Sequence, residues 1–399
     1  MKSHRVAVVV SHPIQHFCPQ YSSWALLPDV DLRVFFASEH GLTAYEDKNF
    51  GKTIQWHGLQ MDFPHEFLPG SSTREVSNSM DSVELNVRLS AFSPHVLVIY
   101  GYSQRLQRHA LGWAKNHKIP IIMVSDSELR AQRNWLILCL KTLFLPLWLR
   151  SCSVFLTTGD ANEAYYRHYG VPDEKLIRCF FPIDVKKYDN ILSDKSIARQ
   201  RIREKLGIPN HHSVILNVGK LVSWKRQCDL VSFSNSLQGR YQDVTVILAG
   251  TGQDETALRA LCQREGPGGV IFAGFISPDE LIEYYCAADI YAACSEREPH
   301  SLAISEAIYC GLPVVISDRC GSYGPSDDVR QGLNGFVYRC GEVSELSRRI
   351  LFILQDTDIH TQMSKASAKI SRQHQALAHG EALTQALVVI SANYTEKTA

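Results

Sequence analysis

Short runs of β-branched and other apolar residues alternate with longer, helix-like segments along almost the whole chain. The strand candidates are RVAVVV, DLRVFFA, HVLVIYG, IPIIMVS and SVFLTTG in the first half, and SVILNVGK, VTVILAG, VIFAGF, DIYAAC, PVVIS and GFVY in the second. This alternation is typical of parallel sheets whose strands are joined by helices. Because the pattern fills both halves, it predicts an α/β chain with two doubly wound domains rather than one large sheet.

A change of composition separates the two halves. Residues 179–200 lose apolar periodicity and gain charge, as a linker does. We therefore expect a Rossmann-like N-terminal domain at residues 1–187 and a second one at residues 188–374. From residue 375 to residue 399 the sequence predicts a terminal helix with no following strand. Two such domains would place the carboxyl ends of both sheets at one cleft, where folds of this kind bind ligands.

The composition excludes some functions. The chain has 41 basic and 41 acidic residues, so the net charge is zero. Nucleic-acid binding, which usually needs a basic surplus, is therefore not favoured. The eleven cysteines contain no C-x-x-C pair, which favours reduced thiols and argues against a zinc site. The N-terminal run VAVVV is shorter than a signal-peptide core, so we expect a cytoplasmic protein.

The most apolar stretch is WLILCLKTLFLPLWL, residues 135–149, which is interrupted by Lys141 and Pro146. It is shorter than the roughly 20 residues that span a bilayer. The favoured interpretation is a buried helix pair at a domain edge. The alternative is an interfacial helix that touches the inner face of the membrane transiently while the protein meets a lipid-linked substrate.

One loop carries glycine and two lysines after a predicted strand. In ILNVGKLVSWKR the strand ends at Val218-Gly219, and Lys220 and Lys225 bracket the turn before the next helix. A glycine lets the backbone approach a ligand, and two ammonium groups beside it suit a diphosphate. An ordinary solvated loop is the alternative interpretation.

A second motif, EREPHSLAISEAIYCGLPVV, places two glutamates around a helix start. The unpaired amides of Ser301, Leu302 and Ala303 would hold phosphates. Glu306 lies too far into the helix to cap it, and its carboxylate suits the two hydroxyls of a ribose. Glu298, on the loop, would face the sugar end of the same ligand. Together with the two lysines, these residues describe a site for a nucleoside diphosphate that bears a sugar.

The spacing E-x7-E, followed by AIYCGLPVV, resembles the signature of the family 4 retaining glycosyltransferases. VGKLVSWKR resembles the phosphate-binding loop of that family, and LAGTGQDE, VIFAGFISPDELIEYYCAADIYAACS and LNGFVY follow in the family's order. The resemblance covers residues 201–355 well and the first 200 residues more loosely. It implies the GT-B architecture, in which two Rossmann-like domains face each other across a cleft and residues 375–399 cross back to the first domain.

The resemblance also implies an activity. The protein would move a hexose-type sugar, with retention, from a nucleoside-diphosphate sugar to a glycan, a lipid-linked acceptor or a small molecule, as in polysaccharide biosynthesis. A UDP-sugar is the favoured donor and a GDP-sugar the alternative, with no cofactor and no metal required. Lys220 and Lys225 would neutralise the leaving group, with Glu298 at the donor sugar. The implied donor site comprises Gly219, Lys220, Lys225, Gly250, Phe275, Ile276, Glu298, His300, Ser301, Leu302 and Glu306.

The chain departs from the family pattern at several positions. His300 replaces a common phenylalanine, and we expect it beside the donor sugar. The first loop, SHPIQHFCPQY, is similar to a His-Pro-Ile-Gln subset of the family. The loop would offer His12, Gln15 and His16 to an acceptor hydroxyl, with His16 as the base. Many members of the family have a histidine later in the first domain, and the expected substitutes for it here are Tyr102, Asp126 and Glu128, which complete the acceptor-side set. A sugar-nucleotide 2-epimerase and a non-catalytic nucleotide-sugar-binding protein remain the alternatives.

Overall fold

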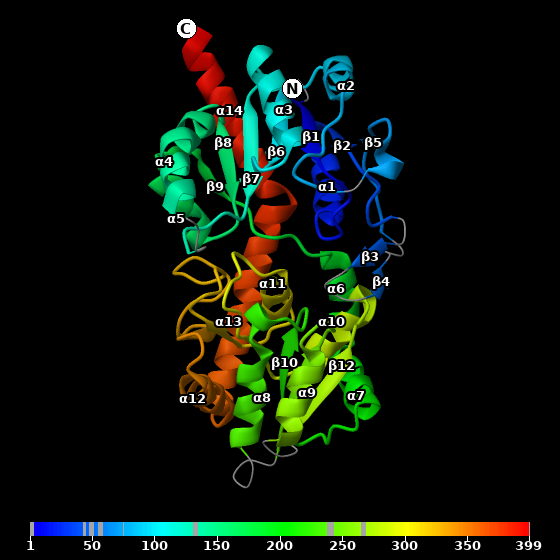
Figure 1. Cartoon of the computed structure of the whole chain (residues 1–399), viewed down its shortest axis with the longest axis vertical. Coiled ribbons are helices and arrows are strands. Elements are labelled where there is room, and N and C mark those ends of the chain that lie inside the picture. Colours follow the sequence, from blue (N-terminus) through cyan, green and yellow to red (C-terminus); the bar gives the residue numbers. More distant parts are fainter. Residues whose placement is uncertain are drawn as a thin grey trace.

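A computed structural model describes residues 4–42, 45–47, 52–54, 59–74, 76–130, 135–237, 243–264 and 269–398. The chain forms two lobes, one above the other in Figure 1, and each lobe is built on a parallel sheet with helices around it. The predicted α/β class and the two doubly wound domains are therefore confirmed.

The first sheet is all parallel, and within the described residues its order is β5-β2-β1-β6-β7-β8-β9. The direction of the chain connections reverses between β1 and β6, so the loops after these two strands meet at a switch point. The apolar side chains of Val6–Val10 are buried at the centre of the sheet. The strands are β1 His4–Val10, β2 Val30–Phe36, β5 His65–Phe67, β6 Val96–Tyr100, β7 Ile121–Ser125, β8 Val154–Thr157 and β9 Leu176–Arg178.

Helices cover both faces of this sheet (Figure 1). The α3 helix forms because Leu106, Ala110, Leu111 and Trp113 recur at helical spacing and are buried on the sheet. A short antiparallel hairpin, β3 Tyr45–Asp47 and β4 Lys52–Ile54, lies outside the sheet. The helices are α1 Cys18–Ala25, α2 Leu85–Phe92, α3 Arg105–Asn116, α4 Trp135–Leu149 and α5 Asp160–His168.

The second sheet, with the order β12-β11-β10-β13-β14-β15 in the described part of the chain, has its switch point between β10 and β13. Its strands are β10 Ser213–Val218, β11 Val244–Ala249, β12 Val270–Gly274, β13 Ile290–Ala293, β14 Val314–Ser317 and β15 Gly335–Tyr338. The helices of this lobe are α6 Val185–Leu192, α7 Lys195–Lys205, α8 Gln227–Ser236, α9 Glu255–Arg264, α10 Pro278–Ala287, α11 Leu302–Tyr309 and α12 Val343–Leu354.

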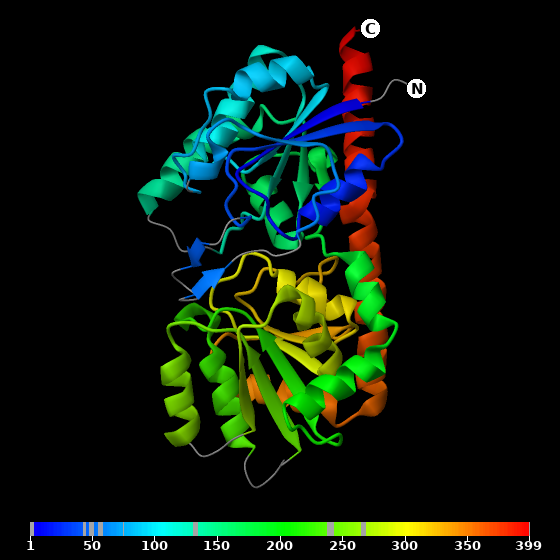
Figure 2. The same cartoon turned by 90° about the vertical axis from the view of Figure 1, so that its right-hand side faces the viewer.

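The chain returns to the first lobe at its C-terminal end. Helix α13 (Thr357–Ala376) continues through a π-helical turn, Leu377–Glu381, into α14 (Ala382–Thr398), and Figure 2 shows the two helices along one side of both lobes. The turn is fixed to α1, because Gln20 Nε2 and Trp24 Nε1 donate hydrogen bonds to the Ala378 carbonyl oxygen at 2.8 and 3.2 Å. Apolar side chains of α14 join the core of the first lobe.

Two local expectations were wrong. Residues 179–200 are not an irregular linker, because α6 and the start of α7 lie within them and their apolar side chains pack on the second lobe. Residues 135–149 form one helix, α4, rather than a buried pair, and much of its apolar surface is exposed. Apolar periodicity alone does not separate a helix covered on all sides from one covered on a single side.

Candidate active site

A cleft of about 1480 Å³ lies at the carboxyl ends of β10 and β13, at the switch point of the second sheet. Its walls come from three parts of the chain. The first lobe supplies Gln15 and His16, the second lobe supplies most of the surface, and α13 supplies Arg372 and Gln375. The cleft is larger than the roughly 300–1,000 Å³ typical of a single small-molecule site, so it has room for two substrates.

The predicted glycine loop lines this cleft. Gly219 and Gly250 have φ angles of +151° and +150°, and the Gly219 N–H donates a hydrogen bond of 3.0 Å to the Ala249 carbonyl. A Cβ atom on Gly250 would lie 1.9 Å from the Gly219 carbonyl oxygen. The two loops therefore pack backbone against backbone, which only glycine permits, and Lys220 follows directly at the cleft wall.

Lys225 and Glu298 meet across the switch point. Lys225 Nζ lies 2.6 Å from Glu298 Oε1, and the other oxygen of this carboxylate accepts a hydrogen bond of 2.6 Å from Ser295 Oγ. Both side chains are mostly buried and line the cleft. The ion pair thus fixes the loop after β10 to the loop after β13.

The start of α11 offers fewer free amides than expected. The Ser301 N–H donates to Ser322 Oγ at 2.9 Å, so the prediction that it holds phosphate needs correction. The N–H groups of Leu302 and Ala303 have no hydrogen-bond partner among the residues that the structure describes, and both residues line the cleft. Because no side chain caps this helix, its first turn can accept an anion.

Glu306 lies on the inner wall of the cleft, in the second turn of α11. Tyr285 Oη donates a hydrogen bond of 2.7 Å to Glu306 Oε2. Burial raises the pKa of Glu306 to about 6, although hydrogen bonds from Tyr285 and Tyr188 and the charge of Lys187 act in the opposite direction. Phe275 and Ile276, two further residues of the expected donor site, line the same cleft.

His300 lies behind the cleft wall rather than in it, which corrects its expected position. Its side chain is 1% exposed, and its Nε2 is 3.6 Å from one oxygen of Asp327 and 3.6 Å from one oxygen of Asp328. Burial alone would lower the pKa of His300, but the two carboxylates raise it by a larger amount, so the net shift is upward. The ring also packs against Phe181 from the first lobe, with ring centroids 4.8 Å apart.

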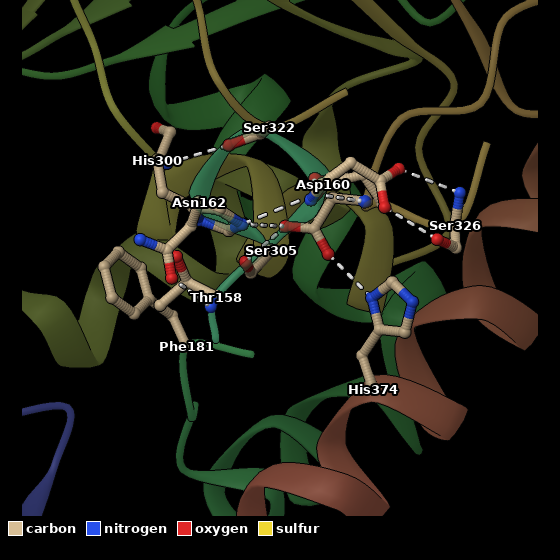
Figure 3. A network of polar contacts seen from close by, with 12 residues as sticks. Thr158, Asp160, Asn162, Phe181, His300, Ser305, Ser322, Ser326 and His374 are labelled. Carbon is tan, nitrogen blue, oxygen red and sulfur yellow. Dashed lines mark hydrogen bonds and ion pairs between the residues drawn. The ribbon is translucent and has the colours of Figure 1, made fainter. Parts of the chain in front are cut away.

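This cluster belongs to a polar network that joins the two lobes (Figure 3). The Asp160 backbone N–H, at the start of α5, donates a hydrogen bond of 2.7 Å to Asp327 Oδ2. The Asp160 carboxylate accepts hydrogen bonds from Ser326 and Arg178. Asp328 accepts a bond of 2.8 Å from His374 Nδ1 on α13. The first lobe, the second lobe and the returning helix therefore meet at one buried cluster.

Potential metal ligands occur in two places in the described residues. His300, Asp327 and Asp328 bring three ligand-type atoms within 4.8 Å of one another, and the surface group comprises His211, His212 and Asp243. In the buried group the carboxylates already accept hydrogen bonds from Asp160, Ser305 and His374. We therefore interpret the buried group as an ion-pair network.

A second cavity, of about 430 Å³, lies at the carboxyl ends of β6, β7 and β8 in the first lobe. Tyr102 and Asp126 line it, as expected for acceptor-side residues, and Phe181 and Thr158 complete the wall. His16 lines both this cavity and the large cleft. Burial, and secondarily the nearby His12, lower the pKa of His16 to about 4, so its imidazole is neutral at physiological pH.

Three other acceptor-side candidates do not line the second cavity. His12 is hydrogen-bonded to Ser11 Oγ and borders neither cavity. Gln15 lies in the large cleft, away from the second cavity. Glu128 is buried beside Arg130, with 3.4 Å between Oε2 and Nη1, and also lies outside both cavities.

The sequence did not indicate the residues that hold these groups in place. Tyr285, Ser295 and Asp160 contact Glu306, Glu298 and Asp327 only after folding. Their sequence contexts are those of ordinary helix and loop residues. The pair Asp327-Asp328 is buried in the fold, but it lies in a polar, glycine-rich stretch of sequence that gives no sign of this burial.

Residues 198–370, which make up most of the second lobe, match the family described as "Glycosyl transferases group 1". The chain is 30% identical over 195 residues to the lipopolysaccharide core biosynthesis glycosyltransferase LpsE of Rhizobium meliloti. The matched segment covers 48% of this chain and 53% of LpsE. The chain is 29% identical over 175 residues to alpha-monoglucosyldiacylglycerol synthase of Acholeplasma laidlawii, and this match covers 43% of this chain and 42% of the synthase. The chain thus spans about half or less of these relatives.

The whole chain is similar in fold to a solved glycosyltransferase structure. Anabaena HepE (Alr3699), crystallised in complex with UDP and glucose, superposes with a TM-score of 0.66 over 98% of this chain and 100% of HepE, at 18% identity. Sequence identity this low shows the fold alone. The predicted GT-B architecture is therefore confirmed.

Proposed function

We propose that this protein is a retaining glycosyltransferase of the family 4 type that uses a nucleoside-diphosphate sugar. The observation that carries the proposal is the contact between Lys225 and Glu298 in a cleft that also holds two unpaired amides and Glu306. An ammonium group beside the amides of Leu302 and Ala303 suits a diphosphate. A buried carboxylate 2.7 Å from a tyrosine hydroxyl suits the hydroxyls of a ribose.

The donor that we propose is a UDP-sugar. The similar fold of HepE, which was crystallised with UDP, supports uridine rather than guanosine as the nucleoside of the donor. Phe275 and Ile276 would pack on the base, and Gly219 and Gly250 would let the backbone approach the phosphates. Because cationic side chains and amides are present where the leaving group would lie, the reaction would require neither a metal nor another cofactor.

The second cavity supports transfer to an acceptor over epimerisation of the donor alone. The acceptor hydroxyl would attack the anomeric carbon from the face of the departing diphosphate, its proton would pass to a phosphate oxygen, and the C1–O bond to phosphate would break. Lys225 and Lys220 would stabilise the charge on the diphosphate. His16, neutral and between the two cavities, would accept a hydrogen bond from a neighbouring hydroxyl of the acceptor and so orient it.

The acceptor classes that fit this site are a glycan, a lipid-linked sugar and a small molecule. Residues 1–187 would bind the acceptor, residues 188–374 the donor, and residues 375–399 would hold the two domains together. The second cavity is lined by Tyr102, Asp126 and Thr158, whose hydroxyl and carboxylate groups suit a polyhydroxylated ligand.

A panel of nucleotides tests the proposal. Thermal shift with UDP, GDP, ADP and their common sugar conjugates should show stabilisation by UDP and one UDP-sugar, and the shift should be lost in Glu306→Ala. Incubation with that donor alone then separates the activities, since a transferase gives at most slow hydrolysis whereas an epimerase gives an isomer. The anomeric configuration of the product, read by NMR, tests retention. No shift with any nucleotide would overturn the proposal.

A further inference from the structure

Helix α4 leaves most of its apolar surface uncovered. Among its described side chains, the exposed large apolar ones are Trp135, Leu138, Leu140, Leu143, Phe144 and Leu147. At 3.6 residues per turn Leu140, Leu143, Phe144 and Leu147 fall within an arc of about 100°, on the side of the helix opposite the buried Leu145 and Leu149. A contiguous apolar surface of this kind marks an interaction site rather than ordinary surface scatter.

The inner side of α4 is fixed to the first lobe. Leu145 and Leu149 are buried, and Lys141 Nζ donates a hydrogen bond of 2.8 Å to Tyr102 Oη. Tyr102 lines the second cavity, so one residue connects the helix to the wall of that cavity. Both Figure 1 and Figure 2 show α4 on the outside of the first lobe.

The sequence around α4 is basic, although Arg130 is paired with Glu128 at 3.4 Å. Between Glu128 and Asp160 the sequence contains four basic residues and no acidic one, although the whole chain has zero net charge. The four are Arg130, Arg133, Lys141 and Arg150. Two of them, Arg133 and Arg150, stand in the sequence on either side of the helix. Basic residues that flank an apolar helix favour an anionic lipid surface.

The length of α4 decides between lying on a membrane and crossing it. Its 15 residues rise about 22 Å, which is less than the roughly 30 Å of a hydrocarbon core. Among the described helices, none is long and apolar enough to cross a bilayer. A helix of this length is too short to cross a bilayer, but it is long enough to lie along the surface of one.

We propose that α4 docks this protein on an anionic lipid bilayer, with Leu143, Phe144 and Leu147 inserted among the acyl chains. A second copy of the chain would bring the basic residues on either side of α4 together, so the like charges of Arg133 and Arg150 favour an anionic lipid surface over self-association. The docking does not depend on the proposed transferase activity. If that activity is correct, the contact between Lys141 and Tyr102 holds the acceptor cavity next to the membrane.

Vesicle flotation tests the docking with the full chain. Wild-type protein should float with vesicles of phosphatidylcholine and phosphatidylglycerol, and less with phosphatidylcholine alone or at high salt. The double variant Leu143→Glu/Leu147→Glu should reduce binding at least about tenfold, because two inserted side chains become charged. The matched control is Val83→Glu/Val87→Glu, two exposed valines with the same spacing on the same lobe.

The controls separate this proposal from its alternatives. Both double variants should keep the thermal shift with UDP, which shows that they fold and that donor binding is a separate property. The docking is wrong if wild-type protein does not float with anionic vesicles, or if both double variants lose binding equally. A wild-type dimer in light scattering that Leu143→Glu/Leu147→Glu converts to a monomer, without flotation, would assign α4 to self-association instead.

Discussion

Lys225 and Glu298 form an ion pair of 2.6 Å between the two loops that flank the switch point of the second sheet. A buried pair of this kind contributes little net stability, because desolvation offsets most of the attraction. Its consequence is positional, since each charge holds the other at the cleft wall. When a diphosphate binds, Lys225 can contact both the phosphate and Glu298, which would place Glu298 next to the sugar.

Replacement of Lys225 by alanine should lower turnover by about 100-fold to 1,000-fold, because charge on the leaving diphosphate would lose a preorganised cation. Steady-state release of the nucleoside diphosphate measures the effect. Lys115→Ala, at an exposed position on α3, is the matched control and should keep wild-type turnover. Equal turnover of Lys225→Ala and wild type would contradict the role of Lys225 in departure of the leaving group.

Gly250→Ala should lower the free energy of unfolding by more than about 2 kcal/mol and abolish nucleotide binding. The new Cβ would lie 1.9 Å from the Gly219 carbonyl, at a φ of +150° that side chains rarely adopt. Gly112→Ala on α3 is the control, because no atom lies within 4 Å of its added Cβ. A helical Gly-to-Ala change there should stabilise by up to about 1 kcal/mol. Urea denaturation measures both variants.

The sequence predicted the fold well because its signals are local. Every strand of both sheets except β5 and β9 coincides with a short apolar run predicted as a strand, and the start of α10 followed from Ser277, whose Oγ accepts a hydrogen bond from the Glu280 N–H. The short strands β5 and β9 were missed, since His65–Phe67 and Leu176–Arg178 carry no such run. Three residues at a sheet edge pair because of the neighbouring strand rather than because of their own propensity.

The candidate site was predictable where a motif sits at the end of a strand. Gly219, Lys225, Glu298 and Glu306 all reach the large cleft for that reason. His300 was misplaced because its position depends on Asp327 and Asp328, which are distant in sequence and attract the imidazole away from the cleft. Such long-range electrostatic partners leave no local pattern.

The network around Asp160 should control how firmly the two lobes are held together. Asp160→Asn removes the charge that Ser326 and Arg178 contact, and should lower the free energy of unfolding by about 1–3 kcal/mol. Asp173→Asn, in the exposed ion pair with Arg167 at the other end of α5, should cost less than about 1 kcal/mol. Equal losses in urea denaturation would show that the Asp160 network is no stronger than a surface pair.

The same network should respond to acid. Burial alone would raise the pKa of Asp160, but hydrogen bonds from Arg178 and Ser326 lower it by a larger amount, so the net shift is downward. A carboxyl group with a lowered pKa in the folded state stabilises above its unfolded pKa, and that stability is lost as the pH falls through the folded value. The difference between wild type and Asp160→Asn should therefore be full at pH 7 and shrink below about pH 4.

Ionisation of Glu306 should have opposite effects on stability and on binding. As the pH rises, it should destabilise the ligand-free protein and strengthen nucleotide binding. Burial raises the pKa of Glu306 to about 6, so the empty protein loses stability from this group as the pH rises from about 4.5 to 6. Ribose hydroxyls need the ionised carboxylate as acceptor, so UDP affinity should rise over the same range. Calorimetric titration from pH 5 to pH 8 measures it.

The phosphates of UDP also ionise in this pH range, but their ionisation affects wild type and Glu306→Gln equally. A comparison of the two proteins therefore isolates the ionisation of Glu306. The glutamine keeps an oxygen to accept the Tyr285 hydroxyl but has no charge to gain. Its UDP affinity at pH 8 should be about tenfold to a hundredfold weaker than that of wild type, and the gap should narrow towards pH 5. Parallel pH profiles for the two proteins would mean that Glu306 does not contact the ribose, because only a titrating acceptor changes the slope.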